Sequence, residues 1–274
     1  MERNTKSVVT QTITPDDMVS RDDLLAAEEP LEIRISHGAG EQRRRLSLAV
    51  TMRTPGDDED LAAGFLFTEG IIQDAGQILA IKWLAENTVQ VELQPSVQVD
   101  EARLTRHLFT SSSCGVCGKA SLDAVQTVAC HFPKAGYPRV DRQALFSLPA
   151  ALRQAQKTFE ATGGLHAAGL FDAGGNLLLL REDIGRHNAV DKVIGAALRS
   201  AWPLPFRDCL LLVSGRAGFE LVQKAAMAGI PLLAAVGAPS SLSAELAANS
   251  GMTLVGFLRG ERFNIYAHPD RISG

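Results

Sequence analysis

"LLLVSGRAGFELVQKAA", residues 210–226, contains the change of pattern that decides the fold: four apolar residues, a stretch of small residues, then apolar residues at helical spacing. A continuous apolar run that ends at glycine is typical of a strand buried on both faces. The same order recurs over 230–250, and 252–260 supplies another apolar run. Apolar strands that alternate with short helices predict an α/β sheet covered on both faces.

This rhythm extends upstream to about residue 140, so we expect an α/β domain over 140–274. Asp141 is a good N-terminal capping residue for a helix, which Pro149 is expected to break into two pieces. The other elements expected there are strands over 165–172 and 176–183 and a helix over 188–200.

The first 139 residues show a different pattern. Residues 31–36 and 45–52 alternate apolar and polar side chains around a glycine-containing turn, which predicts a hairpin. A helix is expected to begin near the acidic run Asp57 to Asp60, because negative charge stabilises a helix N-terminus. The expected organisation is a disordered tail over 1–30 and a smaller mixed domain over 31–139.

Composition excludes several classes of protein. The 274 residues carry 27 Lys and Arg against 31 Asp and Glu, a net charge of -4, which disfavours a general nucleic-acid binder. No apolar run approaches the roughly 18 residues that span a bilayer, and the N-terminus lacks the apolar core of a signal peptide. The 4 cysteines do not form a disulfide framework, so we expect a reducing, cytoplasmic location.

Two cysteines lie in the serine- and glycine-rich loop "TSSSCGVCGKAS", residues 110–121. With Cys130 and His131, Cys114 and Cys117 give C-x2-C-x12-C-H, which superficially resembles a zinc site. Adjacent side chains diverge on a helix or strand, however, so Cys130 and His131 are poorly placed to reach one ion. We therefore expect no metal, and Cys130 and Cys209 are interpreted as buried small hydrophobes.

The alternative is that Cys114 and Cys117 are reactive thiols. A thioredoxin-like C-x-x-C would follow a strand near the start of the chain, whereas the element before this loop is predicted to be helical. Loop 110–118 offers few apolar anchors and is expected to be mobile. Lys119 and the following helix N-terminus would lower the thiol pKa and favour the nucleophilic thiolate.

A charged cluster is predicted at the carboxyl end of a strand in the α/β domain, where ligands commonly bind. The alternative is a solvated charged face, with Asn188 serving as a helix cap. Its members are His166, Glu182, Asp183, Arg186, His187, Asn188, Asp191 and Lys192.

Small or cationic residues also follow three predicted strands. Small residues let backbone N–H groups approach an anion, and arginine adds a charged fork. These junctions match neither the G-x-G-x-x-G motif nor the Walker P-loop. Together they predict one anionic, nucleotide-bearing ligand along the edge of the sheet. The candidate residues are Ser214, Gly215, Arg216, Ser240, Phe257, Leu258, Arg259, Gly260, Glu261 and Arg262.

Taken together, the motifs strongly resemble the formate dehydrogenase accessory sulfurtransferase family, also called FdhD. The likeness runs in order from about residue 50 to 266. The motifs that carry it include "MRTPGDDEDLAAGFLFTEGII", "SSSCGVCGKAS", "TGGLHAAGLFD", "REDIGRHNAVDKVIG", "SGRAGFELVQKAAMAGIP", "APSSLSAELA" and "GMTLVGFLRGERFNIY".

The resemblance implies a sulfurtransferase and assembly chaperone with a cytidine-deaminase-like C-terminal α/β domain. It implies that a cysteine desulfurase donates persulfide sulfur. The sulfur then passes to the bis(molybdopterin guanine dinucleotide) cofactor of a molybdenum- or tungsten-dependent formate dehydrogenase, with GDP as a partial mimic. It also implies a homodimer that binds the formate dehydrogenase apoprotein. Deaminase zinc chemistry is not expected, because Ala168 stands where the catalytic glutamate of H-x-E would be.

Cys114 is expected to hold the persulfide, since it lies farther from the following helix and reaches a docked desulfurase more easily. Cys117, closer to Lys119, is expected to help release the sulfur. The non-catalytic alternative is a chaperone that binds the cofactor and uses the cysteines only to stabilise the loop.

Overall fold

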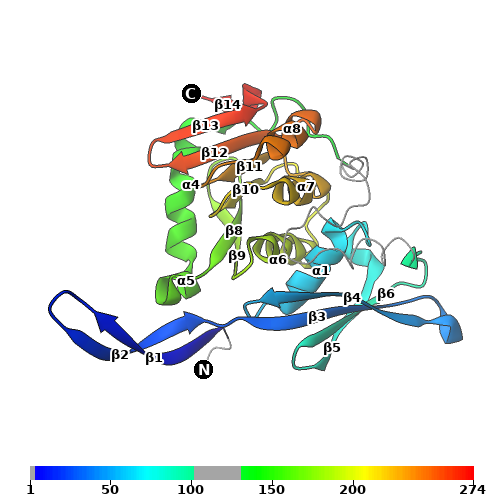
Figure 1. Ribbon diagram of the computed structural model, residues 1–274. Coiled ribbons are helices and arrows are strands. Elements are labelled where there is room, and N and C mark those ends of the chain that lie inside the picture. Colours follow the sequence, from blue (N-terminus) through cyan, green and yellow to red (C-terminus); the bar gives the residue numbers. More distant parts are fainter. Residues whose placement is uncertain (1–3, 102–130) are drawn as a thin grey trace.

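The computed structural model describes residues 4–101 and 131–274 (Figure 1). Its main feature is a six-stranded sheet in the order β13-β12-β11-β10-β8-β9, in which β10, β11 and β12 are parallel and the other strands antiparallel to their neighbours. The mixed α/β fold class is thus confirmed. The strands are β8 (His166–Phe171), β9 (Leu177–Asp183), β10 (Leu210–Val213), β11 (Leu232–Ala235), β12 (Thr253–Arg259) and β13 (Arg262–Ala267).

Helices cover both faces of this sheet, as the apolar strands predicted. Along β10, Leu210 and Leu212 belong to one hydrophobic core, which α4 completes, and Leu211 and Val213 to the other, which α6, α7 and α8 complete. Figure 1 shows α4 apart from the other three helices. The helices are α4 (Arg142–Ala155), α6 (Arg186–Arg199), α7 (Phe219–Met227) and α8 (Ser241–Asn249).

The helix that begins after Asp141 is broken, but not where the sequence predicted. The Asp141 side chain accepts the Gln143 N–H at 2.7 Å, as expected of a cap. Pro149 lies inside an uninterrupted α4, and the break falls at Gln156, before α5 (Lys157–Thr162). The Glu182 carboxylate accepts the first N–H groups of α5, from residues 158 and 159, at 3.0 and 2.8 Å, and this long-range cap fixes the start of the second helix.

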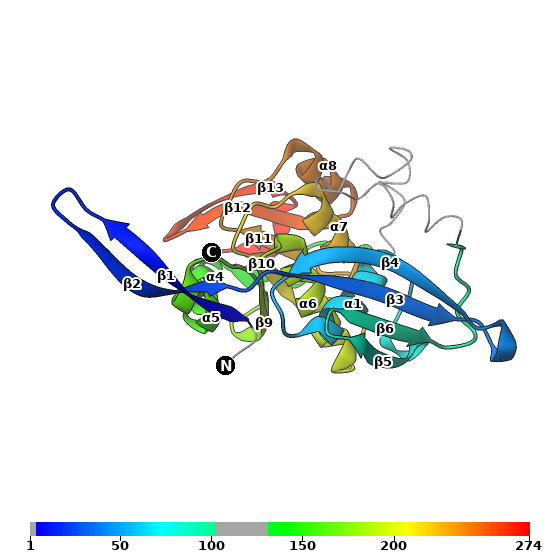
Figure 2. The same cartoon turned by 60° about the horizontal axis from the view of Figure 1, so that its bottom comes forward.

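The N-terminal part contains a four-stranded sheet in the order β4-β3-β6-β5. Its strands are β3 (Glu29–His37), β4 (Arg44–Arg53), β5 (Ile78–Ala85) and β6 (Thr88–Leu93), and β3 and β4 are the predicted hairpin. Helix α1 (Asp58–Thr68) lies between this sheet and α6 (Figures 1 and 2). The larger hydrophobic core runs continuously from Ile33 through Leu61 to Val190, so residue 140 does not separate two cores.

Residues 5–26 correct the prediction of a disordered tail over 1–30. They form an antiparallel hairpin of β1 (Thr5–Ile13) and β2 (Met18–Ala26), which projects from the body (Figures 1 and 2). The β-branched residues of β1 favour a strand, whereas the polar composition of this segment favours disorder. Asn4 anchors the base by donating to the Thr158 hydroxyl of α5 at 3.0 Å.

The remaining elements are short: β7 (Val140–Asp141), which pairs in parallel with β14 (Ile272–Ser273), and 3-10 turns at Gly40–Gln42, Ala75–Gln77 and Pro269–Arg271. In the two described ranges, no helix has the length and apolar character required to cross a membrane. The predicted loop 110–118 and its flanking helices lie outside the described residues.

Candidate functional site

One edge of the six-stranded sheet gathers most of the predicted site residues. The carboxyl ends of the parallel strands β10, β11 and β12 meet there, so the segments that follow them are neighbours. Because β8 is antiparallel to β10, its first residue, His166, also lies at this edge. His166 pairs across the ladder with Asp183, the last residue of β9, which brings the start of α6 to the same place.

Backbone hydrogen bonds join these segments into a continuous surface, which we call the carboxyl edge. The Gly237 N–H donates to the Gly215 carbonyl at 2.9 Å, and the Phe257 N–H donates to the Gly237 carbonyl at 3.0 Å. The Ser214 hydroxyl accepts the Ala167 N–H at 2.9 Å. The three junctions singled out in the sequence are therefore brought together.

Some of the small residues at this edge have a packing reason. A Cβ on Gly237 would lie 2.9 Å from the Gly215 carbonyl oxygen, and one on Gly256 would lie 2.7 Å from the Pro239 ring. Phe257 adopts a left-handed φ of 54°, which is unusual for a non-glycine residue. These positions require small or strained residues simply to let the segments approach one another.

Three predicted ligands have internal roles. The Ser240 side chain accepts the Ser243 N–H at 3.2 Å and forms a capping box at the start of α8. The acceptor role of the Ser214 hydroxyl holds β8 against the β10–α7 loop. Leu258 is fully buried in the core on the α4 side of the sheet.

The side chains of Arg216, Arg259 and Arg262 at the carboxyl edge, by contrast, are exposed and can contact a ligand. Arg259 and Arg262 face each other in the β12–β13 ladder, on either side of the exposed turn Gly260-Glu261. Two like charges in cross-strand positions repel one another unless an anion lies between or near them. Among the described residues, neither arginine nor the exposed Arg216 has a carboxylate within ion-pair distance.

The charged cluster of the sequence separates into a half-buried and a fully buried part. His166, Arg186 and His187 lie at the carboxyl edge, where His187 pairs with Glu220 of α7 at 2.8 Å. Glu182 caps α5, on the far side of β9 from the cluster. Asp191 is buried and pairs with Lys224 of α7 at 2.9 Å.

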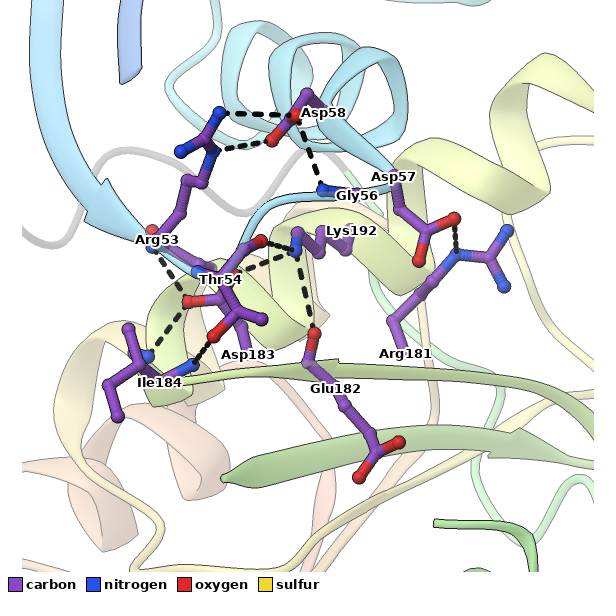
Figure 3. A network of polar contacts seen from close by, with 12 residues as sticks. Arg53, Thr54, Gly56, Asp57, Asp58, Arg181, Glu182, Asp183, Ile184 and Lys192 are labelled. Atoms are coloured by element: carbon purple, nitrogen blue, oxygen red, sulfur yellow. Dashed lines mark hydrogen bonds and ion pairs between the residues drawn. The ribbon is translucent and has the colours of Figure 1, made fainter. Parts of the chain in front are cut away.

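The buried part centres on the ion pair of Lys192 and Asp183 (Figure 3). Their side chains are 1% and 0% exposed, and Nζ lies 2.8 Å from the carboxylate. Lys192 also donates to the Thr54 carbonyl at 2.9 Å, and Asp183 accepts the Thr54 N–H at 3.2 Å. Sequence reasoning missed Thr54, although it belongs to the motif "MRTPGDD" that marked the resemblance.

Asn188 belongs to the same network and is not a helix cap. The N-cap of α6 is Gly185, whereas the Asn188 amide donates to Asp183 at 3.0 Å and to the Met52 carbonyl at 2.8 Å. The network therefore ties the end of β4 to the end of β9, and so fixes the residues that lead into the carboxyl edge.

The acidic start of α1 is neutralised by arginines from other elements. Asp58 pairs with Arg53 of β4 at 2.8 Å, and Asp60 pairs with Arg181 of β9 at 2.7 Å. Arg199 of α6 contacts both Asp60 and Glu59. The favourable helix N-terminus anticipated from sequence is thus accompanied by specific ion pairs that clamp α1 onto the α/β part.

Cys114 and Cys117, the predicted reactive pair, lie outside the described residues, as does Cys130. Cys209 is free and buried, as expected, and burial raises its thiol pKa to about 11, which makes it a poor nucleophile near neutral pH. Within the described ranges, no group of three histidine, cysteine or acidic side chains is arranged to hold a metal ion.

Comparisons with known proteins agree on one family. The family model described as FdhD/NarQ family matches residues 26–273. The protein named sulfur carrier protein FdhD of Streptomyces coelicolor is 52% identical over 265 residues, 93% of this chain and 90% of that one. The protein of the same name from Sulfurisphaera tokodaii is 42% identical over 251 residues, 92% of each chain.

A solved structure gives the same result for the fold. The crystal structure of a protein from Desulfotalea psychrophila, described as a formate dehydrogenase accessory protein, superposes with a TM-score of 0.76. It covers 98% of this chain and 99% of its own length, at 27% sequence identity.

Proposed function

The chain belongs to the FdhD/NarQ family, and we propose on this basis that it is a sulfurtransferase and assembly chaperone for formate dehydrogenase. It takes persulfide sulfur from a cysteine desulfurase and delivers it to the molybdenum bis(molybdopterin guanine dinucleotide) cofactor, which is its substrate. The observation that carries the proposal is the combination of Cys114-x-x-Cys117 with relatives named sulfur carriers, which match nearly the whole chain.

The sulfur steps need only thiol chemistry. The Cys114 thiolate attacks the terminal sulfur of the desulfurase persulfide, one S–S bond forms as another breaks, and the desulfurase thiolate leaves. In the release step, the Cys117 thiolate attacks Cys114 Sγ and displaces the outer sulfur as hydrosulfide toward the metal. The two cysteines are left as a disulfide, which a cellular thiol reductant reopens.

The carboxyl edge supports the proposed cofactor site. The guanine dinucleotide carries a diphosphate, and arginine guanidinium groups bind phosphate through charged, bidentate hydrogen bonds. Arg216 and Arg259 lie on neighbouring segments joined through Gly237. Arg259 is held in place because its Nε donates to the Val236 carbonyl at 3.1 Å, which leaves the other guanidinium nitrogens for a ligand.

GDP, as the distal part of the cofactor, is expected to bind this edge. Replacing Arg216 or Arg259 by alanine should weaken GDP binding by about 1–3 kcal/mol, because each change removes a charged hydrogen bond. Calorimetric titration of the purified chain measures this. Arg207→Ala is the matched control, since Arg207 is also exposed but precedes β10 and so lies at the opposite edge. Equal affinities for all four proteins would place the nucleotide elsewhere.

Activation of formate dehydrogenase tests the function itself. In cells that lack the native protein, Cys114→Ser should give no active formate dehydrogenase, because no persulfide forms on the chain. Cys117→Ser should keep partial loading but slow the activation, because release is impaired. Full activity with both cysteines replaced would instead support the non-catalytic chaperone, whose function requires cofactor binding alone.

A further inference from the structure

Two side chains at the carboxyl edge, those of His166 and Arg186, lie close enough to interact electrostatically and have no hydrogen-bond partner among the residues that the structure describes. His166 begins β8, and Arg186 is the first residue of α6. The His166 ring lies against the β10–α7 loop, where a Cβ on Gly215 would be 3.4 Å from Nδ1. Within the described residues the imidazole accepts and donates no hydrogen bond, and the buried Nε of Arg186 has no partner either.

Unused polar groups of this kind need an explanation. A buried guanidinium nitrogen without an acceptor is unfavourable, because it has lost its hydration without replacement. The other charges nearby are already satisfied: Asp183 pairs with Lys192, and His187 pairs with Glu220. Arg216, on the loop beside the imidazole, adds further positive charge. The group that would complete this arrangement is a negatively charged hydrogen-bond acceptor.

The electrostatics of the imidazole point the same way. Burial lowers the pKa of His166, Arg186 and His187 lower it further, and Asp183 only partly opposes them. The ring is therefore mostly neutral near pH 7 in the free protein. A bound anion would offset the charge of Arg186 and accept a hydrogen bond from the imidazolium, and so would raise this pKa.

We propose that His166 and Arg186 form a paired subsite for a phosphate group, in which Arg186 supplies a fixed charge and His166 takes up a proton as the anion binds. The subsite rests on the proposed cofactor site and adds a proton linkage to it. Because His166 gains a proton only in the complex, affinity should rise as the pH falls through the interval between its free and bound pKa values.

The test is calorimetry on the full-length protein with two probes, GDP and inorganic pyrophosphate, in two buffers of unlike ionisation enthalpy. At about pH 6.5, near the ordinary pKa of histidine, the wild type should take up more protons per bound ligand than His166→Gln does. This comparison removes the protons bound by the phosphate itself, whose second pKa is about 6.

Arg186→Gln should weaken binding about tenfold or more, and Arg186→Lys should recover part of the loss. Thermal melts of all variants exclude unfolding as the cause. Proton uptake on binding GDP alone assigns the subsite to a nucleoside phosphate. Proton uptake with both probes assigns it to phosphate in general. If the wild type binds neither probe, the proposed cofactor site is contradicted as well as the subsite. Binding with unchanged proton uptake in His166→Gln and unchanged affinity in Arg186→Gln would overturn the subsite alone.

Discussion

Replacing Lys192 by methionine is expected to lower the free energy of unfolding by about 3–5 kcal/mol. The change leaves the Asp183 carboxylate, 0% exposed, without its counter-ion. It also leaves the Thr54 carbonyl without the ammonium that donates to it at 2.9 Å. A buried charge that keeps its desolvation penalty and loses its partner is strongly destabilising, whereas methionine fills nearly the same volume.

Denaturant titration of wild type and variant measures this loss. Lys157→Met is the matched control, because Lys157 is exposed on α5 and its replacement should change stability by no more than about 0.5 kcal/mol. The double variant Lys192→Met/Asp183→Asn should recover part of the loss, since it removes the unpaired charge. A Lys192→Met protein as stable as the control would show that the network in Figure 3 does not hold β4 and β9 together.

Replacing Gly195 by alanine is expected to be the other large effect, a loss of about 3 kcal/mol. Glycine in an exposed helix is less favourable than alanine by about 1 kcal/mol, so propensity alone predicts stabilisation. Here α6 crosses α1 so closely that a Cβ on Gly195 would lie 1.9 Å from the Asp60 carbonyl oxygen. On the facing helix, a Cβ on Gly64 would lie 1.8 Å from the Asp191 carbonyl oxygen.

Because both obstacles are backbone atoms, neither helix can make room by a rotamer change, and the helices must separate. Gly195→Ala and Gly64→Ala should each lower the thermal midpoint. Gly164→Ala should not, since its Cβ would meet the Ala26 methyl at 3.7 Å and the Thr162 carbonyl oxygen at 3.9 Å, both ordinary van der Waals distances. A Gly195→Ala protein that melts at or above the wild-type midpoint would mean that the two helices do not cross this closely.

The alternation of apolar strands and helices after residue 140 was predictable, because each strand is buried on both faces and each helix has an apolar side. The ends of α4 and α5 were not. Asp141 is a local cap that directly precedes α4 and accepts the Gln143 N–H two residues later. Glu182 caps α5 from 23 residues away in the chain, so no local sequence pattern indicates this cap. The hairpin over 5–26 was missed because its side chains are mostly exposed, so its sequence lacks the apolar pattern of a strand that packs on a core.

The candidate site likewise depends in part on contacts between residues far apart in the chain, which sequence patterns do not reveal. Arg186, Arg216 and Arg259 could be assigned to one sheet edge from the order of the strands, since the carboxyl ends of parallel strands coincide. Sequence alone could not distinguish Arg186, which has no partner in the described part of the chain, from Lys192, which lies six residues later on the same helix and is buried against Asp183. That distinction depends on where Thr54 lies, and Thr54 is more than a hundred residues away in the chain.

The central claim is that a loop cysteine carries sulfane sulfur, and the intact mass of the chain tests it most directly. After incubation with a cysteine desulfurase and cysteine, the account predicts a gain of one sulfur atom that a thiol reductant removes. Peptide mapping should place it on Cys114, and Cys114→Ser should show no gain. A wild-type chain that gains no reducible sulfur, beside a desulfurase that demonstrably carries its own persulfide, would contradict the account.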